Sequence, residues 1–402
     1  MTKLFYENQY IREFTAEIIE INEKGSDFHI VLNETYFYPE GGGQPSDIGH
    51  IDSIPVTYVY EENEKIYHVL TRKPNKIKRV KCTIDWEVRY DHMQQHLGQH
   101  ILSASFLEMI NGRTVNFHLG KEYCTIDIEG MIQAPAIETS LKRANERICE
   151  NILVEFLFPT KAELKKLGIK KALPKTDAPL RIVKIEDWDI NPCCGLHPRS
   201  TIEVQLLKVI KWEKHKDNTR IYFLAGKRAV SDSILKDEFS KNVCKTLQCS
   251  EEQAFAKIEK LSKDYSQIVS ENRFLQAKVA EYEAANMVRE SAVVKNITVV
   301  SAIFDDRDSK SAQLLATKIT ESTEAVVIFG VKTVENCSLL CMCSKSLKKL
   351  NMNNLLKDAI TLLDGKGGGS PFSAQGAGKS KNNLDSTVDY ATNKIMREIE
   401  GK

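Results

Sequence analysis

The first part of the chain alternates hydrophobic and polar residues in short segments. Glu17–Ile21 and Phe28–Leu32 are rich in β-branched residues, and the glycine-containing turn between them indicates a hairpin. Val56–Tyr60 and Lys65–Leu70 form a second alternating pair of the same kind. These closely spaced pairs predict a small β-barrel or curled sheet over residues 1–84.

Between residues 85 and 230, helical and strand patterns are mixed. Arg89–Ala104 contains no proline and is built from helix-tolerant residues, and Ile137–Asn151 also has a helical pattern. Cys124–Gly130 is short and β-branched, which is typical of a strand. The mixture predicts an α+β domain over residues 85–230.

Residues 231–290 have the spacing of a coiled coil. Apolar positions step by alternating fours and threes over about four heptads, and Asn272 is the polar position that can fix their register. The partner of this helix is either Ile234–Leu247, folded back as a hairpin, or a second subunit. The seam positions are Ala254, Ile258, Leu261, Tyr265, Ile268, Asn272, Leu275, Val279 and Tyr282.

Residues 291–402 change to an α/β pattern, so the whole chain is predicted to be an α+β multidomain protein. Strand candidates are Ile297–Ile303, Ala325–Val331 and Ser338–Cys343. An amphipathic helix follows the glycine-rich stretch near residue 370, which places the glycines within a domain. Backbone N–H groups flanked by lysines suit a phosphate or an RNA backbone. The candidate residues are Lys366, Gly367, Gly368, Gly369 and Lys379.

Composition narrows the class of protein. The chain has 56 Lys and Arg against 55 Asp and Glu, so no global positive field attracts nucleic acid and any such binding must use local patches. The ten cysteines are scattered, no secretory leader is evident, and no apolar run approaches the roughly 18 residues that span a bilayer. We expect a soluble cytoplasmic protein with reduced thiols.

Three histidines in Arg89–Ala104 repeat at every fourth residue, namely His92, His96 and His100. On a helix each adjacent pair projects from one face and can bind one metal ion. His92 and His100 diverge by roughly 80° and lie about 12 Å apart along the axis, so one ion cannot use all three. His96 belongs to either pair.

A second group of candidate ligands lies far downstream, in the segment Asn191–Pro198. Cys193 or Cys194, together with His197 and two helical histidines, completes a tetrahedral nitrogen and sulfur set that suits Zn²⁺. Taken alone, a histidine pair on a helix more often reflects packing, and the Cys/His turn shifts the balance toward one metal site.

Three successive glycines, Gly41, Gly42 and Gly43, precede Gln44 in the N-terminal region. Glycines allow the backbone to approach a ligand closely, and the Gln44 amide offers both a donor and an acceptor. A plain Gly/Pro turn is the alternative interpretation. The segment lacks the Gly-Lys-Ser/Thr ending of a phosphate-binding loop, which argues against an ATP site.

The order of these motifs resembles one protein family. A Gly-Gly-Gly-Gln block, His-x-x-x-His, Cys-x-x-x-His, Arg-Ile followed by Ala-Gly, a coiled coil and a glycine-rich C-terminal domain is similar to the long-form, AlaX-type alanyl-tRNA editing proteins. Such proteins are similar to the editing and C-terminal parts of alanyl-tRNA synthetase. The resemblance covers nearly the whole chain.

The resemblance assigns roles to particular residues. It selects His96 with His100 and Cys193 with His197 as ligands of one Zn²⁺, and it leaves His92 and Cys194 in the outer environment or incidental. It places Gln44 in the editing pocket. It also implies that the C-terminal domain, similar to the DHH-associated module, contacts tRNA and supports a homodimer.

Two positions depart from the family pattern. Leu97 and Leu196 stand where family members commonly carry threonine, and both are candidate substrate-binding residues. Accepting serine while rejecting alanine requires a hydrogen-bonding partner for one added hydroxyl. Selectivity is therefore relaxed, moved to another donor, or shifted toward glycine.

The resemblance implies hydrolysis of serine or glycine from mischarged tRNA(Ala), with Gln44, His96 and His100 at the catalytic centre. Four protein ligands normally leave a zinc ion no open position, so a ligand gives way, coordination expands to five, or the ion only positions substrate. The alternatives are a non-catalytic, zinc-stabilised tRNA-binding protein and an enzyme that edits Ser-tRNA(Thr).

Overall fold

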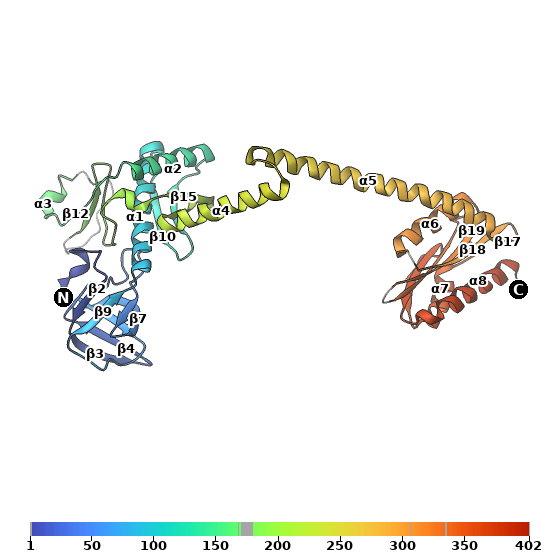
Figure 1. Ribbon diagram of the computed structural model, residues 1–402, viewed down its shortest axis with the longest axis horizontal. Helices are drawn as coiled ribbons and strands as arrows, with labels where there is room; N and C mark the ends of the chain where they lie inside the picture. Colours follow the sequence, from blue (N-terminus) through green and yellow to red (C-terminus); the bar gives the residue numbers. More distant parts are fainter. Residues whose placement is uncertain (1, 168, 170–179, 306, 334–335, 402) are drawn as a thin grey trace. The chain divides into compact units, whose positions relative to one another are not determined.

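The computed structural model describes residues 2–167, 169, 180–305, 307–333 and 336–401. The chain divides into two compact units, Met1–Thr246 and Leu247–Lys402, and both are mixtures of helices and sheets (Figure 1). This confirms the α+β multidomain class. Within the described ranges, no helix combines the length and apolar character that crossing a membrane requires.

The N-terminal sheet has seven strands in the order β2-β9-β6-β7-β8-β4-β3. Their bounds are β2 (Glu13–Ala16), β3 (Ile18–Lys24), β4 (Asp27–Leu32), β6 (Gly49–Ile51), β7 (Ile54–Glu62), β8 (Lys65–Leu70) and β9 (Val80–Ile84). A short parallel pair, β1 (Thr2–Lys3) and β5 (Glu34–Thr35), with the 3₁₀ turn η1 (Leu4–Tyr6), lies beside it in sequence. Both predicted hairpins are present, since β3 pairs with β4 and β7 pairs with β8, each antiparallel.

This sheet is not a closed barrel, so that part of the prediction is wrong. The edge strands β2 and β3 are consecutive in the chain and only Glu17 separates them. An antiparallel pair needs a turn of about two residues and a parallel pair needs a long crossover, so β2 and β3 cannot pair with each other. The described residues accordingly form an open sheet.

Helix α1 (Trp86–Ile110) follows the sheet and covers the predicted helical segment. The Asp85 side chain accepts a hydrogen bond from the Val88 N–H and caps the helix, and Asn111 ends it in the left-handed conformation. An ion pair between two fully buried side chains, Arg89 of α1 and Asp47 of the loop before β6, joins the helix to the sheet.

A four-stranded antiparallel sheet, β10-β11-β16-β15, packs on α1 with helix α2 (Ala134–Cys149). Its strands are β10 (Thr114–Leu119), β11 (Cys124–Glu129), β15 (Leu207–His215) and β16 (Asn218–Ala225). The shared core contains Leu97 and Phe106 of α1, Ile126 of β11 and Phe223 of β16, all fully buried. The middle of helix α1 is covered on several faces by α2 and by strands of the neighbouring sheets. Its polar residues are therefore buried together with its apolar ones.

A small antiparallel sheet, β12-β13-β14, carries the Cys/His turn. Its strands are β12 (Val154–Leu157), β13 (Ile182–Ile185) and β14 (Asp189–Pro192), and the short elements α3 (Lys161–Leu164) and η2 (Thr201–Val204) flank them in sequence. Strand β14 ends at Pro192, so Cys193 directly follows a strand that is fixed by its backbone hydrogen bonds to β13.

The second unit is a three-layer α/β domain. Its six-stranded sheet has the order β17-β18-β19-β20-β22-β21, and only β18 and β19 pair in parallel. The strands are β17 (Ala292–Val294), β18 (Ile297–Phe304), β19 (Ala325–Lys332), β20 (Cys337–Cys343), β21 (Lys366–Gly369) and β22 (Ser373–Gly378). One core joins a sheet face to α5 (Glu251–Glu290) and α6 (Ser309–Ser322). The other core joins the opposite face to α7 (Met352–Ala359), η3 (Ile360–Leu363) and α8 (Leu384–Glu400), and η4 (Lys381–Asn383) leads into α8.

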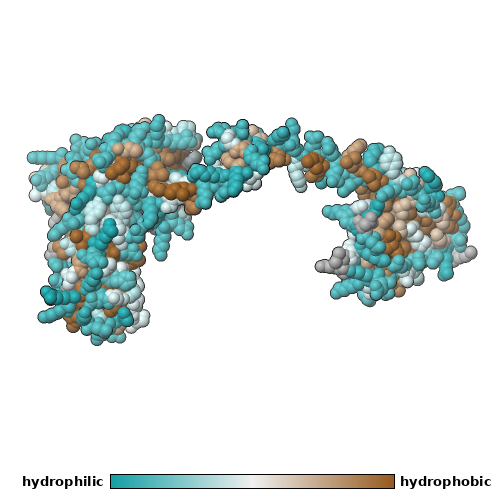
Figure 2. All heavy atoms as spheres, viewed as in Figure 1, coloured by the Kyte–Doolittle hydropathy of each residue, from teal (hydrophilic) through white to brown (hydrophobic). Residues whose placement is uncertain are grey.

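Helix α5 packs against α6 only near its C-terminal end, through Ala280 and Ala284. Most of the predicted seam is exposed, from 48% at Ile258 to 74% at Tyr282, and apolar residues mark the length of the helix in Figure 2. Helix α4 (Gly226–Leu247) likewise exposes Phe239. The coiled coil therefore stays a prediction.

Candidate metal and deacylation site

Four predicted ligands, His96, His100, Cys193 and His197, meet in the first unit. Their ligand atoms all lie within 4.8 Å of one another. Cys193 Sγ is 3.4 Å from His96 Nε2 and 3.7 Å from His197 Nε2. In a tetrahedral site the ligand atoms lie about 2.0–2.3 Å from the zinc ion, which places them roughly 3.5 Å from one another. The observed separations between the ligand atoms are of this size, so the donor set fits Zn²⁺.

Gln44 fixes the orientation of His96. The Gln44 Oε1 atom accepts a hydrogen bond from the Leu196 backbone N–H at 2.9 Å, which identifies it as the amide oxygen. The same oxygen lies 2.9 Å from His96 Nδ1, so Nδ1 must carry the proton. The lone pair of His96 is thereby placed on Nε2, the nitrogen that faces Cys193.

Asp189 plays the equivalent part for His100. Its Oδ2 atom is 2.8 Å from His100 Nδ1, and a carboxylate can only accept this hydrogen bond. Burial lowers the pKa of His100, but Asp189 and Cys193 outweigh it and raise the pKa to about 9. Metal binding at Nε2 must therefore displace a proton.

Cys193 is prepared to act as a thiolate. Burial raises the pKa of its thiol, but His96, His197 and His100 offset this effect and hold the pKa well below its ordinary value. Thiolate is the form that binds zinc. Arg181 holds the loop in place, because its Nη1 donates to the carbonyls of Cys193 at 2.9 Å and Gly195 at 2.7 Å.

Glycines allow the two loops to pack closely on the ligands. A Cβ atom on Gly195 would lie 2.2 Å from His96 Cε1 and 2.8 Å from Gln44 Oε1. Gly42 and Gly43 have φ angles of 58° and 78°, and Gly41 and Gln44 exchange backbone hydrogen bonds across them. This is a turn with left-handed central residues, which glycine adopts without strain.

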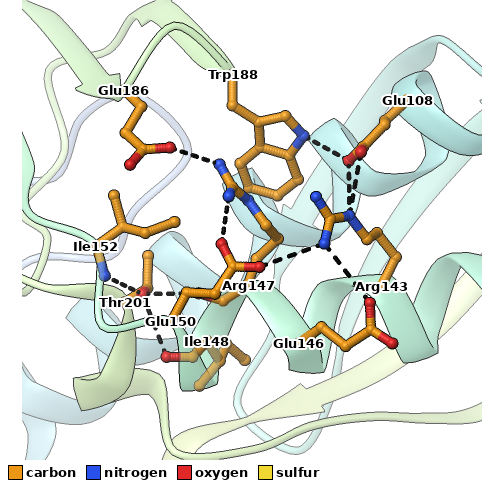
Figure 3. Close-up of polar contacts among 10 residues, drawn as sticks. All are labelled: Glu108, Arg143, Glu146, Arg147, Ile148, Glu150, Ile152, Glu186, Trp188 and Thr201. Atoms are coloured by element: carbon orange, nitrogen blue, oxygen red, sulfur yellow. Dashed lines mark hydrogen bonds and ion pairs between the residues drawn. The ribbon is translucent and has the colours of Figure 1, made fainter.

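A polar network attaches the β13–β14 hairpin to helices α1 and α2 (Figure 3). Trp188, next to Asp189, donates its indole N–H to Glu108 of α1 at 2.7 Å. Arg147 of α2 lies over the Trp188 ring and bonds Glu186 at 2.9 Å. The network therefore holds the turn that supplies Asp189 to His100.

His96, His100 and Cys193 line a cavity of about 820 Å³, a size suited to a small organic group, whereas His197 is not among its described lining residues. Its described lining is Lys3, Tyr6, Gly42, Gly43, His96, Gln99, His100, Phe117, Phe158, Leu180, Arg181, Asn191, Pro192, Cys193 and Cys194. The sequence analysis missed Gln99 and Asn191, although spacing could have identified both. Gln99 follows His96 by three helical positions, and Asn191 precedes Cys193 by two positions at the end of a strand.

Several predicted site residues lie elsewhere. Gln44 contacts His96 and Gly41 lies in the same turn, but neither is among the described lining residues. Leu97 and Leu196 are buried in two different hydrophobic cores and are also absent from that lining. His92 lines a separate cavity of about 720 Å³.

The predicted tRNA-binding residues belong to the second unit. Lys366, Gly367, Gly368 and Gly369 form β21, an exposed strand at the edge of the six-stranded sheet. Lys379 follows β22, the only strand that pairs with β21 among the described residues. Because β21 is an edge strand, one side of its backbone has no strand partner among the described residues, although the Gly369 N–H donates to Asn353 Oδ1.

Three protein-family models match this chain. The model described as "Threonyl and Alanyl tRNA synthetase second additional domain" matches residues 180–222, which include Cys193 and His197. The "DHHA1 domain" matches residues 296–397, and "tRNA synthetases class II (A)" matches residues 3–88.

Known relatives extend over nearly the whole chain. Alanyl-tRNA editing protein AlaX-L of Pyrococcus horikoshii is 30% identical over 413 residues, covering 99% of this chain and 99% of that protein. Alanyl-tRNA editing protein Aarsd1-B of Xenopus laevis is 28% identical over 380 residues, covering 93% and 90%. The alanine–tRNA ligase of Methanobrevibacter smithii is 26% identical over 411 residues, covering 98% of this chain and 45% of the ligase. The chain belongs to the alanyl-tRNA editing protein family.

Proposed function

We propose that this protein is an aminoacyl-tRNA deacylase that acts in trans on mischarged tRNA(Ala), releasing serine or glycine. One observation carries the proposal: three members of the His/Cys cluster, His96, His100 and Cys193, line a cavity of about 820 Å³ in a chain that matches alanyl-tRNA editing proteins along its length. The product of the reaction is free amino acid and tRNA with an unesterified terminal ribose.

His96, His100, Cys193 and His197 would hold one Zn²⁺ in this proposal. When bound, the ion supplies Lewis-acid polarisation of the ester carbonyl. Gln44 keeps the proton of His96 at Nδ1, and Asp189 keeps that of His100 at Nδ1, so Nε2 is the nitrogen of each ring that would bind the ion, in His100 after loss of its second proton. In this scheme Gln44 is a positioning residue and has no direct contact with substrate.

The lining supplies no carboxylate among its described residues, so a general base of that kind is not at hand. We assign the activation of the attacking water to the free hydroxyl of the terminal ribose, which lies next to the ester in the substrate itself. Phe117, Phe158 and Tyr6 contribute aromatic rings to the wall of the cavity.

Serine selectivity is assigned to Gln99 and Asn191. Both amides are buried, at 3% and 7% exposure, and both line the cavity. Their nitrogen atoms donate to Ser103 and Asp189, so the carbonyl oxygens are the groups that a serine hydroxyl can reach. Leu97 and Leu196 pack in the cores and need not take part.

We assign binding of the tRNA outside the cavity to lysine side chains and to backbone N–H groups of the second unit. Lys366–Gly369 and Lys379 would contact the tRNA backbone in the second unit, with a homodimer formed through the exposed seam of α5 or through the last domain. We place the protein in the cytoplasm, where its substrate is made. The proposed domains remain 1–84, 85–230, 231–290 and 291–402, with the last serving tRNA binding and dimerisation.

Deacylation assays test the proposal directly. The purified chain is incubated with Ser-tRNA(Ala), Gly-tRNA(Ala), Ala-tRNA(Ala) and Ser-tRNA(Thr), and release of amino acid is followed. We expect release from the first two substrates only, and a Gln99→Leu variant should lose preference for serine over glycine. Release no faster than the spontaneous background from every substrate would favour a non-catalytic tRNA-binding protein, which the four protein ligands also allow.

A further inference from the structure

His197 differs from the other two histidines of the cluster at its second ring nitrogen. His96 Nδ1 lies 2.9 Å from Gln44 Oε1, and His100 Nδ1 lies 2.8 Å from Asp189 Oδ2. His197 Nδ1 has no hydrogen-bond partner among the described residues, although its side chain is fully buried. The three imidazoles are therefore held unequally.

The missing partner affects metal binding. A neutral imidazole that binds a metal through Nε2 must carry its proton on Nδ1. For His96 and His100 that proton has an acceptor, whereas for His197 it would be a buried donor without one. A buried N–H group without an acceptor costs free energy, and this cost lowers a binding constant by about 5- to 150-fold. The contribution of His197 to metal binding should be reduced by a factor of this size.

The alternative state of His197 is better satisfied. With the proton moved to Nε2, the ring can donate to the Cys193 sulfur, which lies 3.7 Å away. Nδ1 then carries only a lone pair. The main chain of His197 stays fixed in either state, because Gln9 Nε2 donates to its carbonyl oxygen at 3.1 Å.

We propose that His197 would be the exchangeable ligand of a bound ion, since it is also the one member of the cluster that is not among the described residues lining the cavity. His96, His100 and Cys193 then form the permanent set. This proposal rests on the proposed zinc-dependent function, and it explains how four protein ligands can coexist with a reactive site.

Zinc affinities of single variants provide the first test. Dissociation constants are measured by competition with a chromophoric chelator for the wild type, His96→Ala, His100→Ala and His197→Ala. We expect His197→Ala to retain zinc about 5- to 150-fold more tightly than the other two variants. Asp189→Leu is the matched control, because it removes the acceptor from His100 and should weaken zinc binding about 10- to 100-fold. Equal or greater loss in His197→Ala than in His96→Ala would overturn the proposal.

A second test uses the unmodified chain. In zinc-loaded protein labelled with ¹⁵N-histidine, the ring nitrogen shifts report which imidazoles bind metal. We expect saturating serine hydroxamate to convert only His197 Nε2 from the bound to the free shift, while His96 and His100 stay bound. Release of either of these, or retention of all three with the hydroxamate bound, would contradict the exchange. A wild-type chain without measurable zinc affinity would instead refute the metal site on which the proposed function depends.

Discussion

Replacing Gly195 by alanine tests whether the loop contact holds the His96 ring in place. The added Cβ would lie 2.2 Å from His96 Cε1 and 2.3 Å from Nδ1, whereas ordinary contacts begin near 3.4 Å. The ring or the loop must therefore move by about 1 Å. A displacement of this size at a reacting centre costs about 100-fold in rate, equivalent to about 2.7 kcal/mol of transition-state stabilisation.

The assay compares kcat/KM for Ser-tRNA(Ala) and the zinc content of Gly195→Ala with those of the wild type. Gly25→Ala is the control, because a Cβ there meets no atom within 4 Å and only its left-handed φ of 65° is strained. We expect the control to lose about 1 kcal/mol of stability and to keep its activity and zinc. Wild-type activity and zinc in Gly195→Ala would refute the claim that this contact positions His96.

Three further predictions concern stability and assembly. Arg89→Met leaves the Asp47 carboxylate buried without its ion pair and should lower the free energy of unfolding by about 3–5 kcal/mol in urea titrations; a loss under about 1 kcal/mol would contradict the role of the pair. Burial lowers the pKa of His68 to about 4, below about 6.5 in the unfolded chain, so the unfolded chain binds the extra proton first. Stability should fall as the pH drops from about 6.5 to 4, and His68→Gln should flatten that slope in denaturation series measured by circular dichroism. Ile268→Lys, in the exposed seam of α5, should reduce the mass seen by light scattering to that of the 45.6 kDa monomer, and an unchanged dimer mass would exclude the seam from the interface.

Local spacing was sufficient to predict much of the fold and the ligand group. The β3–β4 and β7–β8 hairpins follow from alternation and turn residues that act over a few positions. His96 and His100 are related by one helical turn, and Cys193 and His197 also lie four residues apart. Zinc chemistry suggested that the two groups form one site, but only the family resemblance selected His96 with His100 over the pair with His92, and Cys193 over Cys194.

The remaining features depend on tertiary packing. The contact of Asp189 with His100 joins residues 89 positions apart, and alternation along β14 shows only that Asp189 and Asn191 share a face. Leu97 and Leu196 are adjacent in sequence to a ligand, yet helix and loop geometry turn both into hydrophobic cores. Barrel closure was predicted from strand number and pattern alone, which contain no information on which strands become edges.

The Gln44 amide oxygen has a consequence for how the chain matures during synthesis. Its two donors lie 52 and 152 positions downstream, so a nascent chain can complete the N-terminal sheet long before this oxygen is satisfied. Contacts of such long sequence separation form slowly and late. A ribosome-bound fragment that ends before Leu196 should therefore have a folded sheet but no competent centre, and the N-terminal module alone cannot inherit the activity by gene truncation.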